Sequence, residues 1–359
     1  MILKSWRDRL RKVSPHPEVN LTMVNSVSVV IHPSQFPAAV SEQLRESLRT
    51  RMMNHKFHYD TPRQASAWLR VHDSYSPARR DEGCEEMYAS GFAQVAKRMA
   101  VLGDLDVVSL GSGGGRKDAT LVRALHARNP DVHYRYIPVD VSPGLSILSR
   151  AAVVEAGMSA QRCAPVVMDL EAEPDWEEAL RGVTRAAVPR VVCFFGMLPN
   201  CDSGRVFPRL ASILGDADVL LMSANLAPGS SYRRGVERVQ PQYDNPLTRE
   251  WLLASLFNVG VDPDDGSLSF AIREWPLGSG LLRIEGEFTF EKDRHLDCEG
   301  EAFSFASGER FRLFFSYRHT PKIVDQLCRQ HGMRVMDSWV SVSEDEGLFL
   351  VEPCRKECE

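Results

Sequence analysis

Five short apolar runs alternate with helical segments between residues 106 and 224 of this chain. The runs are 106–110, 136–140, 164–170, 190–195 and 217–224, and the helices between them are expected near 117–127, 144–156, 174–182 and 203–214. Strands and helices that alternate at this spacing form a parallel sheet with helices on both faces, and strands covered on both faces are apolar almost throughout. The sequence therefore predicts an α/β fold built on a Rossmann-like, doubly wound sheet.

The regions on either side of this alternation have other patterns. Helices are expected near 41–53 and 82–101, with a polar, proline-containing stretch between them. After 224 come a polar segment, a helix at 248–257, strand-like runs at 267–275, 281–291 and 311–318, a helix at 321–331, and final runs at 335–341 and 348–352. We therefore predict a helical N-terminal region (1–100) within a substrate lobe, a core (101–226), an insertion after the fifth strand that belongs to the same lobe (227–310), and a partly antiparallel completion of the core sheet (311–359).

Composition excludes several kinds of partner. The 359 residues carry a net charge of −5 without a Lys/Arg run longer than two, which argues against a nucleic-acid or membrane-surface partner. The N-terminus lacks the long apolar core of a signal peptide, and no stretch approaches the length of about 18 apolar residues that spans a bilayer. The eight cysteines show no metal-binding spacing, so we expect no metal site, reduced thiols and a cytoplasmic location.

A nucleotide site is predicted where the first strand of the core ends. Gly111, Gly113 and Gly115 lie between that strand and the next helix, and side chains there would block a ligand from the backbone N–H groups. Asp140 ends the second run, where a carboxylate accepts hydrogen bonds from both ribose hydroxyls of an adenosine. Asp169 ends the third run, where an adenine amino group would lie.

The glycine spacing distinguishes between two nucleotides. A dinucleotide site uses Gly-x-Gly-x-x-Gly, in which the third glycine packs the helix against the strand. Here Gly115 is followed by Arg116 and Lys117, without a small residue at the third-glycine position. This tighter spacing suits a methionine tail better than a pyrophosphate. S-Adenosylmethionine (SAM) is therefore favoured over NAD as the cofactor, with S-adenosylhomocysteine (SAH) as its product.

Several motifs in a fixed order resemble one family. The segments 110–117 (LGSGGGRK), 136–142 (YIPVDVS), 168–171 (MDLE) and 194–196 (FFG) are similar to the histidine-specific, SAM-dependent methyltransferases. The best-known member of that family trimethylates the α-amine of histidine in ergothioneine biosynthesis. The segment 56–60 (KFHYD) is similar to the family's Lys-Trp/Phe-x-Tyr-Asp motif, and 74–79 (SYSPAR) to its Tyr-Pro-Thr-Arg motif. The resemblance covers roughly residues 55 to 352.

The resemblance implies a class I SAM-dependent methyltransferase core and a substrate-recognition lobe from the N-terminal helices and the insertion. On the cofactor side it carries over to Gly111, Gly113, Lys117, Asp140, Asp169, Leu170 and Gly196. On the substrate side it carries over to Tyr59, Tyr75, Asn200, Tyr243, Phe314 and Ser316, with Tyr59 and Asn200 as catalytic residues. In the family, such tyrosines and the asparagine hold the carboxylate and the amine of an amino acid beside the sulfonium.

Two departures from the family pattern concern the acceptor. The family's histidine enzymes bind the imidazole with a glutamate and a serine two residues apart; Ser316 matches the serine, but Phe314 stands at the glutamate position. A phenyl ring cannot accept the imidazole N–H, and an unpaired buried donor costs about 1–3 kcal/mol. The loop from Gly196 to Asn200 is also one residue shorter than in the family. We therefore expect an acceptor other than histidine, with an apolar or aromatic side chain, or another amine.

The leading hypothesis is a methyltransferase that acts on the α-amine of an amino acid or of a related small amine. A second hypothesis moves the methyl group to an oxygen, sulfur or side-chain nitrogen of a small molecule in specialised metabolism. A third is a nucleotide-binding protein without catalysis, which the three tyrosines beside an intact glycine turn argue against. An NAD-dependent oxidoreductase is disfavoured by the glycine spacing. The sequence leaves the acceptor, the number of methyl groups and the oligomeric state open.

Overall fold

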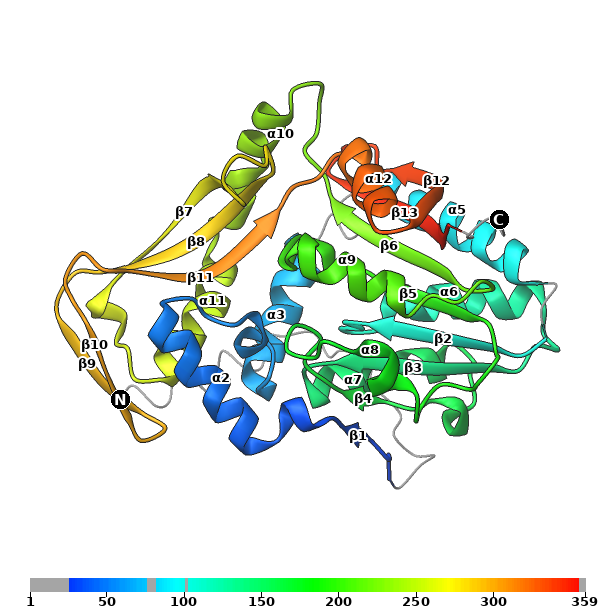
Figure 1. The fold of residues 1–359 in the computed structure, drawn as a ribbon, viewed down its shortest axis with the longest axis horizontal. Helices are drawn as coiled ribbons and strands as arrows, with labels where there is room; N and C mark the ends of the chain where they lie inside the picture. The colour runs from blue at the N-terminus through cyan, green and yellow to red at the C-terminus, as the bar shows by residue number, and fades with distance from the viewer. Residues whose placement is uncertain (1–25, 76–81, 101–102, 355–359) are drawn as a thin grey trace, which may run out of the picture.

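The computed structural model describes residues 26–75, 82–100 and 103–354, which form two lobes (Figure 1). One lobe is built on an eight-stranded sheet with the order β1-β4-β3-β2-β5-β6-β13-β12. Its strands are β1 (Val30–Ile31), β4 (Val166–Val167), β3 (Tyr134–Asp140), β2 (Leu105–Leu110), β5 (Arg190–Phe194), β6 (Val219–Asn225), β13 (Glu346–Pro353) and β12 (Met333–Val340). The first six are parallel, and β13 and β12 are antiparallel to their neighbours. The predicted doubly wound, partly antiparallel sheet is therefore confirmed.

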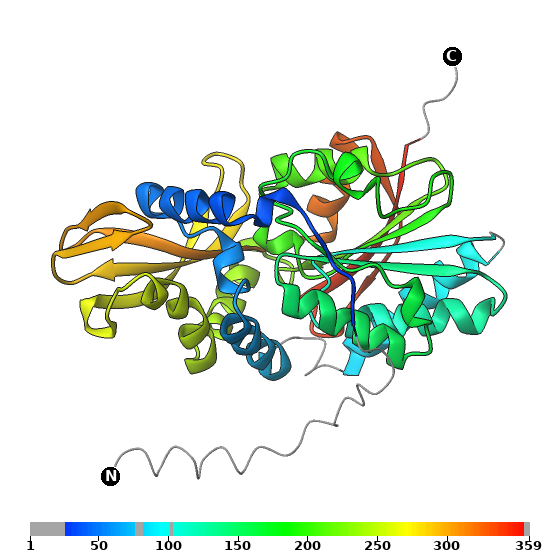
Figure 2. The ribbon, with the colours of Figure 1, turned by 90° about the horizontal axis from the view of Figure 1, so that it is seen from below.

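Helices cover both faces of this core sheet (Figure 2). One face is covered by α5 (Glu82–Met99), α6 (Arg116–Arg128) and α7 (Pro143–Glu155), and the other by α8 (Trp176–Leu180), α9 (Ser203–Ser212) and α12 (Pro321–Gln330). Phe92 and Leu121 are buried on the first face, and Trp176 and Phe207 on the second. All six residues of β2 are buried, as the continuous apolar pattern predicted.

The second lobe is an antiparallel sheet with helices packed against it (Figure 1). The sheet has the order β11-β8-β7 and carries a separate hairpin; the elements are β7 (Gly266–Glu274), β8 (Leu282–Phe290), β11 (Arg310–Tyr317), β9 (Arg294–Cys298) and β10 (Glu301–Phe305). The helices are α2 (Pro37–Thr50), α3 (Pro62–Tyr75), α10 (Tyr232–Val239) and α11 (Pro246–Asn258). Leu48 and Phe57 share one core with Trp251 and Phe288. Helices α2 and α3 of the N-terminal region thus pack in one lobe with the insertion.

Three expectations about these boundaries are wrong. Strand β11 pairs with β8, so residues 311–317 belong to the second lobe and the chain returns to the core sheet only afterwards. In the N-terminal region, β1 pairs with β4, and α5 packs on the core sheet, where Gly91 allows a close approach to Leu348. An apolar run or stripe shows that an element is buried but not which sheet it covers.

The third error concerns the polar stretch after residue 56. Most of it forms α3, which begins directly after Thr61 with Pro62 in its first turn, a position where proline loses no helical hydrogen bond. The sequence pattern also did not predict helix α10 or the β9–β10 hairpin. The run predicted at 164–170 is a strand only over Val166–Val167. None of the helices within the described residues is long and apolar enough to cross a membrane.

Candidate active site

A cavity of about 1100 Å³ lies between the two lobes. Its walls include every residue for which the sequence predicted a role at the site, namely Tyr59, Tyr75, Gly111, Gly113, Lys117, Asp140, Asp169, Leu170, Gly196, Asn200, Tyr243, Phe314 and Ser316. The carboxyl ends of β4, β3, β2 and β5 meet at one edge of the core sheet. The ends of these strands and the segments that follow them contribute seven of the residues, namely Gly111, Gly113, Asp140, Asp169, Leu170, Gly196 and Asn200. In open α/β sheets, ligands bind at this edge.

The glycine turn has a backbone conformation that side chains would disturb. Gly111, Gly113 and Gly115 have φ angles of +70°, +54° and +71°, in the left-handed region that glycine adopts without strain. A Cβ on Gly113 would lie 2.8 Å from the Trp68 ring, and one on Gly115 would lie 2.5 Å from the α-carbon of Ser149. The turn is therefore held between α3 and α7, with its backbone open to the cavity.

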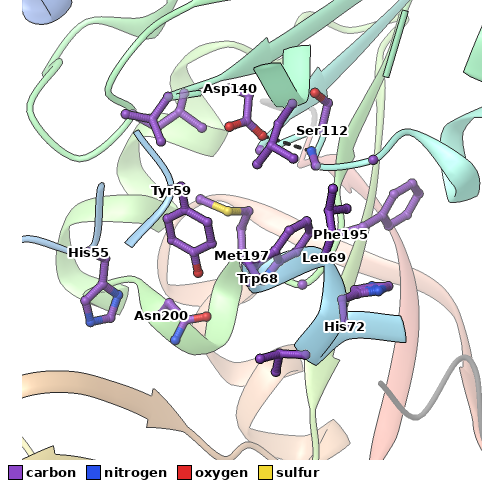
Figure 3. A pocket seen from close by; sticks show the side chains of 18 of the residues that line it. His55, Tyr59, Trp68, Leu69, His72, Ser112, Asp140, Phe195, Met197 and Asn200 are labelled. Atoms are coloured by element: carbon purple, nitrogen blue, oxygen red, sulfur yellow. Dashed lines mark hydrogen bonds between the residues drawn. The ribbon is translucent and has the colours of Figure 1, made fainter. Parts of the chain in front are cut away.

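Asp140 ties the end of β3 to this turn (Figure 3). Its carboxylate accepts hydrogen bonds from the backbone N–H groups of Gly113 at 2.9 Å and Ser142 at 3.0 Å. Burial raises the pKa of Asp140 to about 6, although these two hydrogen bonds favour the charged form. A carboxylate offers about four acceptor positions, so two remain for hydroxyl groups of a ligand.

Asp169, at the end of the next strand, has one unfilled acceptor. Its Oδ1 accepts the backbone N–H groups of Glu171 and Ala172 at 2.9 and 3.1 Å. Its Oδ2 is buried without a hydrogen bond, and the nearest cation is the Lys56 ammonium at 3.8 Å. A buried acceptor beside Leu170 fits an amino group on a flat apolar ring such as adenine. The glycine turn and these two carboxylates thus fit an adenosyl cofactor.

Lys117, which was predicted to bind the cofactor, contacts other side chains of the protein. Its ammonium donates to the Tyr88 hydroxyl at 2.5 Å and to Glu346 Oε1 at 2.9 Å. Burial alone would raise the pKa of Glu346, but Lys117 and Tyr88 outweigh it and hold this pKa below its usual value. The charge of Lys117 is therefore compensated within the protein, where it joins α6 to β13. Its role toward the cofactor stays a prediction.

Aromatic rings of the second lobe line one side of the cavity. Phe314 of β11 packs 5.8 Å from Trp251, 6.0 Å from Tyr243 and 5.5 Å from His55, measured between ring centroids. Tyr59 lies 5.5 Å from Trp251 and 5.8 Å from Trp68 by the same measure. In Figure 3, Tyr59 points into the cavity between His55 and Trp68. This part of the cavity is suited to an apolar or aromatic group.

The polar groups among these rings have defined directions. Asn200 donates its amide N–H to the carbonyl oxygen of Phe315 at 2.7 Å, which fixes the side-chain orientation because a carbonyl can only accept. The Asn200 oxygen is consequently the atom left for a ligand. The Tyr59 hydroxyl has no hydrogen bond to any described residue, and burial raises its pKa above the usual value, so the phenol stays neutral. Both groups can accept an N–H.

Comparison with known proteins places the chain in a family. Residues 39–353 match the profile of the family described as histidine-specific methyltransferase, SAM-dependent. The chain belongs to this family. The predicted membership, the class of enzyme and the SAM cofactor are thereby confirmed at the level of the family.

One curated relative and two solved structures are similar to this member of the methyltransferase family. The N-methyltransferase fsqC of Aspergillus fumigatus is 23% identical over 247 residues, which are 67% of this chain and 64% of that protein, so less than two thirds of the relative is matched. The mitomycin 7-O-methyltransferase MmcR has a TM-score of 0.38 at 16% identity, covering 89% of this chain and 69% of its own. The magnesium protoporphyrin IX methyltransferase of Synechocystis, with bound SAH, has a TM-score of 0.42 at 10% identity. The match covers 82% of this chain and 95% of that one.

Sequence reasoning missed several residues that line the cavity of this methyltransferase. His55 directly precedes the segment 56–60 and accepts the backbone N–H of Phe315 at 3.3 Å, so it binds the same residue whose carbonyl oxygen accepts from Asn200. Trp68 lies on α3, which the sequence pattern did not predict. Arg318 follows Ser316 by two residues and so lies on the same side of the extended chain, a spacing that could have identified it. The remaining residues of the 74–79 motif, after Tyr75, lie outside the described residues.

Proposed function

We propose that this protein transfers a methyl group from SAM to the α-amine of an amino acid whose side chain is aromatic or apolar, rather than to histidine. The aromatic surroundings of Phe314 carry the proposal. Phe314 is 6% exposed and packs against the rings of Trp251, Tyr243 and His55. It stands at the sequence position of the glutamate with which the family's histidine enzymes bind an imidazole N–H.

The choice of an amine as the nucleophile rests on two acceptor oxygens. SAM, when bound, supplies a methyl group that its sulfonium already activates. The oxygen of Asn200 and the hydroxyl of Tyr59 can each accept an N–H of the acceptor's amine and align it. The aromatic walls disfavour the charged ammonium form, so they help to keep the lone pair of the amine free. The A. fumigatus relative is an N-methyltransferase, which also supports nitrogen as the accepting atom.

Incubation with SAM that carries a trideuterated methyl group, together with a pool of the twenty amino acids, tests this function. Tandem mass spectrometry then locates the label. We expect the label on the α-nitrogen of aromatic or apolar amino acids. We also propose that the protein methylates its small-molecule acceptor in the cytoplasm. Label on a side-chain oxygen, sulfur or nitrogen would replace this proposal by the second hypothesis. Tight SAH binding without transfer to any amino acid or small amine would contradict an amine methyltransferase.

A further inference from the structure

Arg318 is a buried cation without a carboxylate partner among the described residues. Among the residues that the structure describes, the buried lysine and arginine side chains are Lys56, Arg283 and Arg318. Lys56 pairs with Asp169, and Arg283 pairs with Glu285. Arg318 is only 4% exposed, and no described Asp or Glu carboxylate lies within 4.0 Å of its guanidinium. A buried charge that is not paired is costly, so such groups mark places where an opposite charge binds.

The contacts of Arg318 leave part of its donor capacity unused. Two N–H groups on Nη1 point to the carbonyl oxygens of Leu226 at 3.1 Å and Asp345 at 3.4 Å, and Nη2 donates to the Tyr243 hydroxyl at 2.8 Å. Its Nε is buried without a hydrogen-bond partner. An arginine has five N–H donors, and its partners here are all neutral. The positive charge and at least one donor therefore remain for a ligand.

Arg318 also orients its neighbours as donors. Because a guanidinium can only donate, the Tyr243 oxygen accepts from it, and the Tyr243 hydrogen goes to Ser316 Oγ at 2.9 Å. The hydrogen of the Ser316 hydroxyl is then free for a ligand in the cavity. The Arg318 guanidinium and the Ser316 hydroxyl, linked through Tyr243, thus present donors and a positive charge, which is the arrangement that a carboxylate requires.

The position of Arg318 assigns it to the acceptor end of the cavity. The chain after Arg318 pairs with the chain that leaves β6, through Leu226 and His319. Strand β6 lies beside β5, whose following loop carries Asn200. Asp140 and Asp169 end β3 and β4, on the other side of β2. Arg318 therefore lies on the side of Asn200 and away from the two carboxylates that fit the adenosyl group.

We propose that Arg318 binds the carboxylate of the acceptor, together with the Ser316 hydroxyl that it orients through Tyr243. This inference rests on the proposed function, because it takes the acceptor to be an amino acid. It explains how the cavity would distinguish an amino acid from the amine that remains after loss of its carboxyl group. The amine lacks the charge that offsets the burial of Arg318.

The test compares the best amino acid from the labelling experiment with its decarboxylated amine, for the wild type and for Arg318→Met and Arg318→Lys. We expect the wild type to prefer the amino acid by at least about tenfold in kcat/KM. In Arg318→Met the KM of the amino acid should rise by at least about tenfold while that of the amine changes less than about threefold, and Arg318→Lys should fall between. The matched control is Arg329→Met, which replaces an exposed arginine on α12 and should leave the KM values of the amino acid and of the amine unchanged.

Two results would overturn the role of Arg318. One is an equal loss for the amino acid and the amine; the other is a wild type that uses both equally well, which would leave N-methylation itself intact. If Arg318→Met does not fold, as judged by its thermal unfolding, Arg318→Lys carries the same comparison. Failure of the wild type to methylate any amino acid would refute the proposed function and the carboxylate site together.

Discussion

Replacement of Asp140 by asparagine should separate cofactor binding from folding. Asparagine has the same shape but only one acceptor oxygen, so one of the two backbone N–H groups that now bind Asp140 would face an amide N–H₂. A free-energy cost of about 1–3 kcal/mol is expected for that unpaired donor. Removal of the charge acts in the opposite direction. Burial raises the pKa of Asp140 from an ordinary 3.8 to about 6, so keeping it ionised at neutral pH costs the fold about 3 kcal/mol.

These two effects on stability nearly cancel, whereas the effect on cofactor binding does not. Hydrogen bonds from ribose hydroxyls to a carboxylate contribute about 1.5–3 kcal/mol each, and the asparagine loses at least one of them. We therefore expect the dissociation constant of SAH to rise about 10- to 100-fold in Asp140→Asn. The melting temperature of the free protein should move by no more than a few degrees.

Protonation of Asp140 should change both the stability of the fold and the affinity for SAH, in opposite directions. Between pH 3.8 and about 6 the folded chain binds the Asp140 proton more tightly than the unfolded chain, so this group lowers the stability as the pH rises through that window. Cofactor binding should show the reverse trend, because protonation removes acceptors. Isothermal titration with SAH at pH 5 and pH 7.5 should show weaker binding at the lower pH for the wild type and little difference for Asp140→Asn. An unchanged affinity in the variant at pH 7.5 would refute the role given to Asp140.

Three other substitutions test separate parts of the account. Phe314→Glu should raise kcat/KM for histidine relative to aromatic amino acids, with less than a threefold change in SAH affinity; equal loss of SAH affinity in this variant and in Asp140→Asn would contradict the separation of the two ends of the cavity. Lys117→Met leaves the buried Glu346 without its cation and should cost about 3–5 kcal/mol in urea unfolding, with most of this regained when Glu346→Gln is added; no regain would mean that Lys117 acts elsewhere. Gly115→Ala should unfold more easily than Gly114→Ala, because only the former places its Cβ 2.5 Å from the backbone of α7 at a φ of +71°; equal stabilities would contradict the fixed turn.

The sequence predicted the core because its signals there are local. Each parallel strand is a short apolar run with its own helix, and the glycines and Asp140 follow directly from the ends of two such runs. Boundaries of β2, β5 and α9 in the structure agree with the expected ones to within two residues. All predicted site residues consequently reached one cavity, even those separated by more than 200 positions, such as Tyr59 and Ser316.

The second lobe was less predictable because its contacts join distant segments. Strand β11 has the same apolar character whether it joins the core sheet or pairs with β8, and only the packing of the whole lobe decides between them. The aromatic wall around Phe314 joins His55, Tyr243 and Trp251, which are far apart in the sequence, and His55 lies just outside the motif at 56–60. The unpaired charge of Arg318 is likewise a property of its burial and not of its sequence neighbours.

The central claim is that Phe314 and its aromatic neighbours have moved this methyltransferase away from histidine. The most direct measurement is the ratio of kcat/KM for phenylalanine to that for histidine, determined on the wild type at saturating SAM. An imidazole N–H buried without an acceptor costs about 1–3 kcal/mol, so the ratio should be at least about 10 in favour of phenylalanine. A ratio at or below one would contradict the account.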